Sequence, residues 1–100
     1  MKEISIKDFL KIDKTNLQII DVRERYEYEN GHINAIHIPM GEILQSTEKI
    51  DLKKQVIIYC QTGKRAAAVV YMLHKQHNLD NIFHLVGGYT AYLDLTSNKS

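Results

Sequence analysis

Cys60, the only cysteine in the chain, stands at the start of a segment that could turn its thiol into a nucleophile. The segment reads Cys60-Gln61-Thr62-Gly63-Lys64-Arg65. Gly63 permits a backbone conformation that a side chain would resist, so a tight loop can turn its N–H groups inward as an anion cradle. Lys64, Arg65 and the start of a following helix add positive potential. These effects favour a thiolate over a thiol, and the thiolate is the reactive form.

Several functions are compatible with such a loop. Cysteine phosphatases surround a phosphate with a Cys-x5-Arg loop, but only four residues separate Cys60 from Arg65 here. The smaller ring suits one extra sulfur atom better than a tetrahedral phosphate. An arsenate reductase would use the same thiolate, but it would also need partner thiols, and this chain has none. A third possibility is a binding or regulatory module in which Cys60 performs no turnover.

The elements that must position this loop alternate between strands and helices. Val56–Cys60 is apolar throughout, which predicts a strand buried on both faces and hence a parallel sheet. Arg65–Gln76 is the strongest predicted helix. The other predicted strands are Ile4–Ile6, Leu17–Val22, Ile36–Ile38 and Ile82–Val86, and the other predicted helices are Lys7–Ile12 (capped by Ser5), Glu24–Glu29, Gly41–Ser46 and Tyr89–Leu95. This alternation predicts an α/β fold, in which ligands bind beyond the carboxyl ends of the strands, where Cys60 stands.

Composition narrows the function further. The 100 residues suffice for one domain, predicted to span residues 1–100. Thirteen Lys and Arg against 12 Asp and Glu give a net charge of +1, which argues against a nucleic-acid-binding protein. No run is long enough for a membrane span and no apolar segment follows the charged N-terminus, so we expect a cytoplasmic protein with a free thiol. A single cysteine cannot form an internal disulfide or a multi-cysteine metal site, and we expect no metal.

Four motifs, in order along the chain, resemble those of the rhodanese-type sulfurtransferases. Cys60–Arg65 looks like the family's Cys-x-x-Gly-x-Arg loop. The other three are Ile19–Glu24, similar to the Asp-Val-Arg segment; Tyr28–Ile33 with Ile38-Pro39, similar to Gly-His-Ile…Ile-Pro; and Leu85–Tyr89, similar to the Gly-Gly turn before the last helix. Together they cover almost the whole chain. In one departure, only Asn34 separates the Gly-His-Ile segment from Ala35, where the family commonly has two residues.

The resemblance implies a mainly parallel sheet of about five strands between helices, and a two-step reaction without a cofactor. Cys60 would take a sulfane sulfur from a small donor such as thiosulfate and become a persulfide. The amides of Gln61 to Arg65 would hold the outer sulfur. Because no second thiol is present, the persulfide must discharge to an external acceptor, either cyanide or a thiol, which could belong to a sulfur-relay protein. We expect a monomer that binds neither nucleic acid nor membrane.

The resemblance also assigns roles to residues outside the loop. Asp21 would face the catalytic loop and pair with Arg65, although a simple turn-capping aspartate fits the sequence equally well. Arg23 would attract an anionic donor, with a solvated surface arginine as the alternative. His32 is expected to hydrogen-bond a turn rather than to act as a general base.

Overall fold

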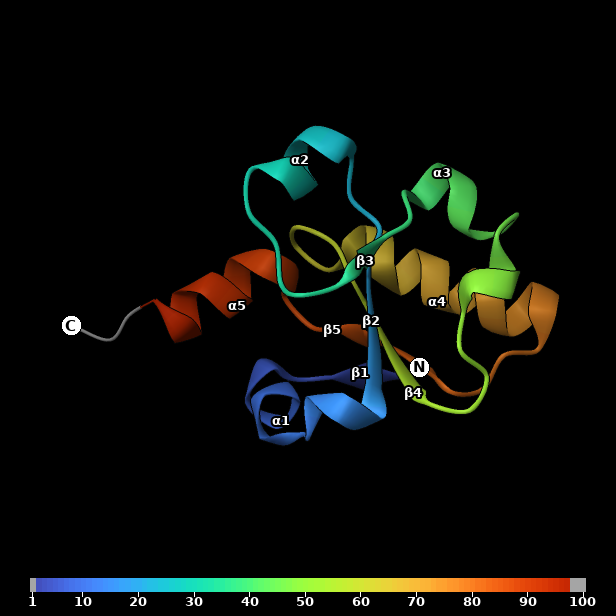
Figure 1. Ribbon diagram of the computed structural model, residues 1–100, viewed down its shortest axis with the longest axis horizontal. Helices are drawn as coiled ribbons and strands as arrows, with labels where there is room; N and C mark the ends of the chain where they lie inside the picture. The colour runs from blue at the N-terminus through green and yellow to red at the C-terminus, as the bar shows by residue number, and fades with distance from the viewer. Residues whose placement is uncertain (1, 98–100) are drawn as a thin grey trace.

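Five parallel strands form one sheet in the computed structural model, which describes residues 2–97 (Figure 1). Their order across the sheet is β1 (Glu3–Ile4), β5 (Ile82–Leu85), β4 (Gln55–Tyr59), β2 (Leu17–Asp21) and β3 (Ile36–His37). The predicted α/β fold with a mainly parallel sheet is confirmed. Met1 and residues 98–100 of the predicted domain lie outside the described residues.

The central strand β4 explains why the sheet must be covered on both faces. Val56, Ile58 and Cys60 belong to one hydrophobic cluster, whereas Ile57 and Tyr59 belong to the other. All five side chains are fully buried. Successive residues of a strand point to opposite faces, so an unbroken apolar run requires an apolar layer on each side.

Helices supply these two layers. The cluster that contains Cys60 includes residues of α3 (Met40–Ile43) and α4 (Lys64–His77). The cluster on the other face includes residues of α1 (Ile6–Lys11), and partly buried residues of α5 (Gly88–Thr96) pack against it. The short helix α2 (Arg25–Glu29) follows β2 and lies beyond its carboxyl end (Figure 1). Within residues 2–97, the structure has no helix of sufficient length and hydrophobicity to cross a bilayer.

The boundaries of the first elements differ slightly from prediction. Strand β1 ends at Ile4 rather than at Ile6, because α1 begins at Ile6. Ser5 caps that helix as predicted, since its side-chain oxygen accepts a hydrogen bond from the N–H of Asp8 at 3.1 Å. The capping residue therefore fixes where the extended segment must stop.

The Gly87-Gly88 turn brings the start of α5 against the segment that follows β4. The N–H of Tyr89 donates to the carbonyl of Cys60 at 2.8 Å, and the N–H of Thr90 donates to that of Gln61 at 3.0 Å. Gly88 has a φ of +61°, and a Cβ there would lie 2.7 Å from the carbonyl oxygen of Gln61. Only glycine permits both this backbone conformation and this close approach.

We expect Gly88→Ala to lower the free energy of unfolding by about 2–4 kcal/mol. The alanine would have to adopt a left-handed backbone conformation, and its Cβ would clash with the backbone of the loop. Gly41→Ala is the matched control, since nothing lies within 4 Å of a Cβ at that position. The control should leave stability unchanged or raise it by less than about 1 kcal/mol. Urea unfolding of both variants measures the difference, and equal stabilities would contradict the proposed packing of the turn.

Candidate active site

The sulfur of Cys60 lies just past the end of β4, and the residue is 0% exposed. Two backbone N–H groups converge on it, from Gly63 at 3.1 Å and from Ala66 at 3.3 Å. Gly63 adopts a left-handed conformation with φ of +107° and caps the N-terminus of α4. The loop therefore aims backbone donors and the positive end of a 14-residue helix at one thiol, an arrangement that stabilises negative charge on sulfur.

The same loop retains donors that the protein does not use. The N–H groups of Gln61, Thr62, Lys64 and Arg65 make no hydrogen bond within residues 2–97. The first N–H groups of any helix lack intrahelical partners and are free for a ligand. The loop therefore offers two N–H groups bound to the sulfur and four without a partner in the described part of the chain.

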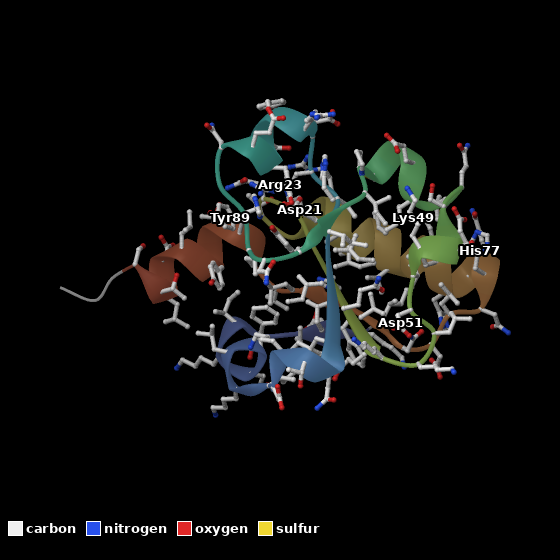
Figure 2. All side chains as sticks on the ribbon, viewed as in Figure 1. Asp21, Arg23, Lys49, Asp51, His77 and Tyr89 are labelled. Carbon is white, nitrogen blue, oxygen red and sulfur yellow. The ribbon has the colours of Figure 1, made fainter. Side chains whose placement is uncertain are left out.

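Arg23 is buried beside the loop, with only 1% of its surface exposed. Its guanidinium donates to the carboxylate of Asp21 through Nε at 3.0 Å and Nη2 at 2.7 Å. Further bonds go from Nη2 to the carbonyl of Gly31 at 2.8 Å and from Nη1 to Oε1 of Gln61 at 2.9 Å. The same group lies 4.6 Å from the centre of the Tyr89 ring, and Figure 2 shows the two together with Asp21.

Through these contacts, Arg23 connects Asp21, Gly31 and Gln61 inside the protein. It ties β2 to the first residue after Cys60, and Gln61 extends the connection by donating from Nε2 to Oγ1 of Thr90 at 3.0 Å. The solvated surface arginine considered from the sequence is therefore wrong. The burial of Arg23 and its contacts also leave no open guanidinium face with which to attract a donor from solvent.

Arg65 pairs with Glu27, not with Asp21. Its Nη1 and Nη2 donate to the two carboxylate oxygens of Glu27 at 2.9 and 3.0 Å. The predicted pairing of Asp21 with Arg65 is wrong, because Arg23 folds back onto Asp21 and occupies both of its oxygens. Sequence reasoning missed Glu27. The available signal was the acidic predicted helix Glu24–Glu29, which offers carboxylates to a cation beside the thiol.

The ion pair shifts the titration of both partners. The hydrogen bonds from Arg65 lower the pKa of Glu27 to about 2, with help from the N–H of Glu24, which donates to Glu27 Oε1 at 2.9 Å. Glu27 in turn raises the pKa of Arg65, with a smaller contribution from the charge of Cys60. The guanidinium of Arg65, at the end of the loop, is therefore already paired with a carboxylate of this chain.

The remaining candidate residues are Thr62 and Lys64, which belong to the loop, and His32, which lies outside it. Thr62 and Lys64 are exposed, and Lys64 forms no ion pair in the part of the chain that the structure describes. His32 is exposed and stacks on the ring of Tyr28 with centroids 3.9 Å apart, while its Nδ1 donates to the carbonyl of Ile33 at 2.9 Å. This contact agrees with a structural role in the turn. Residues 2–97 contain no cluster of side chains suited to a metal.

We expect Glu27→Gln to lower the free energy of unfolding by about 1 kcal/mol at pH 7, because it removes a partly buried ion pair. The native pKa near 2 lies below the ordinary value of 4.5. The contribution is therefore fully present above pH 4.5 and is lost as the pH falls toward 2. Urea unfolding across this range should show the two proteins converging in acid.

The control for this prediction is Glu29→Gln, on the same short helix. Glu29 pairs with Arg25 in an ion pair whose side chains are 62% and 84% exposed. Exposed pairs contribute little, so this variant should match the wild type at every pH. A pH-independent loss in Glu27→Gln would mean that the ion pair is not its cause.

Comparison with known proteins agrees with this geometry. Residues 7–95 match the Rhodanese-like domain family. The thiosulfate sulfurtransferase GlpE of Coxiella burnetii is 33% identical over 82 residues, which cover 81% of this chain and 76% of that protein. The putative sulfur carrier protein YrkF of Bacillus subtilis is 36% identical over 77 residues, covering 74% of this chain and 42% of that protein. The crystal structure of a rhodanese-related protein from Thermoplasma volcanium superposes with a TM-score of 0.86 at 29% identity, covering 96% of this chain and 94% of that one. The chain belongs to the family of rhodanese-like domains.

Proposed function

We propose that this protein is a sulfurtransferase that carries a sulfane sulfur on Cys60. The proposal rests on the backbone N–H groups of the Cys60–Arg65 loop and of the first turn of α4. Two are bound to the thiol sulfur, and those of Thr62, Lys64 and Arg65 are unused within residues 2–97. A persulfide has its negative charge on the outer sulfur, one bond further from the protein. Unused donors around a buried sulfur suit that anion, because preorganised N–H groups stabilise charge without reorganising.

The proposed reaction has two steps. The thiolate of Cys60 attacks the outer sulfur of a donor such as thiosulfate, and the sulfur–sulfur bond of the donor breaks. Sulfite leaves with the electron pair, and Cys60 becomes a persulfide. An external nucleophile, either cyanide or a thiolate, then attacks the outer sulfur and restores the Cys60 thiolate. No electrons enter or leave overall, so the cycle needs no redox cofactor.

The acceptor must come from outside this chain, because Cys60 is its only cysteine. Since Cys60 is fully buried, the acceptor must be slender enough to reach a sulfur inside the loop. A small thiol or a cysteine on a flexible protein segment would fit, and the name of the sulfur carrier protein YrkF supports a protein relay. We also propose that the protein transfers this sulfur as a monomer in the cytoplasm.

The two other functions considered from the sequence receive less support. A phosphatase or arsenate reductase would need a cation to hold the oxyanion, and Glu27 already occupies the guanidinium of Arg65. A non-catalytic binding module would not need an ordered array of donors around its cysteine. The site geometry therefore favours a sulfur carrier over both.

Incubation with thiosulfate should make the protein heavier by one sulfur atom, and intact-mass spectrometry measures the adduct. Cys60→Ser should show no adduct, because an alcohol at this position is a far weaker nucleophile than a thiolate. Added cyanide or a small thiol should remove the extra mass and yield thiocyanate or a low-molecular-weight persulfide.

Two results would contradict this proposal. One is the absence of any adduct with thiosulfate and with a low-molecular-weight persulfide as donor. The other is Cys60-dependent hydrolysis of an aryl phosphate at a rate above that of sulfur transfer, which would favour the phosphatase alternative.

A further inference from the structure

We infer that Glu27 is a specificity-determining residue, whose carboxylate occupies the guanidinium of Arg65 and so keeps the loop from retaining tetrahedral oxyanions such as phosphate. This role concerns the same loop as the proposed sulfur transfer, and it rests on that proposed function. It assigns the selection between a single sulfur atom and an oxyanion to a side chain that lies outside the loop, on α2.

The geometry of the pair supports this assignment. Both terminal nitrogens of Arg65 are engaged, each with its own oxygen of Glu27, at 2.9 and 3.0 Å. This two-bonded arrangement is the one by which a guanidinium would grip a phosphate or sulfate. The carboxylate is itself held, since the N–H of Glu24 donates to it at 2.9 Å. An incoming oxyanion would have to displace a preformed partner that is built into the fold.

The charges around the loop point in the same direction. Arg23 is buried and paired with Asp21, so neither of the two arginines beside Cys60 has its charge free for a ligand. Arg65 is nevertheless the last residue of the Cys60–Arg65 loop, and the charge of Cys60 contributes to the raised pKa of its guanidinium. Without Glu27, a free guanidinium would therefore stand beside the loop whose N–H groups already favour anions.

This selectivity has a use in the proposed reaction. Sulfite leaves as a doubly charged oxyanion while one sulfur atom stays behind on Cys60. A free guanidinium would hold thiosulfate more tightly as well, because thiosulfate is itself a doubly charged oxyanion. It would equally hold the leaving sulfite and ambient phosphate and sulfate, which compete with the next donor for the site. A loop whose arginine is already paired retains the singly charged sulfur through N–H groups and releases the oxyanion.

Protection of Cys60 from iodoacetamide by inorganic phosphate tests the inference directly, at constant ionic strength set by chloride. Cys60 is the only cysteine, so alkylation reports on this site alone. In Glu27→Gln, phosphate should protect Cys60 at about tenfold lower concentration than in the wild type, the effect of one or two charge-assisted hydrogen bonds. Glu27→Ala should shift protection in the same direction, which provides a second variant should the first fold poorly.

The controls separate Arg65 from a general charge effect. The double variant E27Q/R65Q should return to the wild-type phosphate concentration, because the gain depends on the freed guanidinium. Glu29→Gln removes a negative charge from the same helix and should leave protection unchanged, since Glu29 pairs with Arg25 instead. Unchanged protection in both Glu27 variants, or a gain that persists in E27Q/R65Q, would overturn the inference.

Alkylation requires no sulfur transfer, so the two proposals can fail separately. A wild-type protein that takes sulfur from no donor refutes the proposed function, whatever phosphate does. A protein that forms the persulfide but shows no tighter phosphate protection in its Glu27 variants retains the proposed function and loses the selectivity assigned to Glu27.

Discussion

The site depends on the direction in which two peptide groups face. The carbonyls of Cys60 and Gln61 accept hydrogen bonds from the first N–H groups of α5, at 2.8 and 3.0 Å. These bonds fix the two peptide groups whose N–H sides belong to Gln61 and Thr62. The loop that starts with these peptide groups then brings the N–H groups of Gly63 and Ala66 to the sulfur. A peptide group has one donor side and one acceptor side, and satisfying the acceptors elsewhere leaves the donors for the anion. The left-handed conformations of Gly87 and Gly88 allow the start of α5 to approach the carbonyls of Cys60 and Gln61 this closely.

The two arginines near the thiol, Arg23 and Arg65, differ in burial, but both are paired with a carboxylate. Arg23 is buried and connects β2, Gly31 and Gln61, whereas Arg65 is partly exposed and pairs with Glu27 of α2. Each is matched by its own carboxylate, Asp21 or Glu27. The positive potential that remains for a ligand therefore comes mainly from backbone N–H groups and the start of α4, with Lys64 as the exposed cation. Such a field suits a small polarisable anion at one point in space.

Local sequence signals predicted most of the framework. The apolar run in β4 indicated a parallel sheet, and the strand–loop–helix order placed Cys60 at the carboxyl edge where parallel sheets bind ligands. Ser5 was correctly identified as a helix cap. These predictions succeeded because each depends on neighbours in the sequence. The partners of Asp21 and Arg65 were not predictable in this way, because α2 has five residues whose orientation only the assembled fold decides. Arg23 could have faced solvent or the core, and its burial follows from contacts with Gly31, Gln61 and Tyr89.

We propose that the unused N–H groups of the loop hold the outer sulfur of a Cys60 persulfide. A crystal structure of the protein treated with thiosulfate would test it most directly. We expect electron density for one additional sulfur on Cys60, within hydrogen-bonding distance of the N–H groups of Thr62, Lys64 and Arg65, with the Glu27–Arg65 pair intact. An outer sulfur that points away from these N–H groups, or that is held by the guanidinium of Arg65, would show that the loop amides do not hold the persulfide.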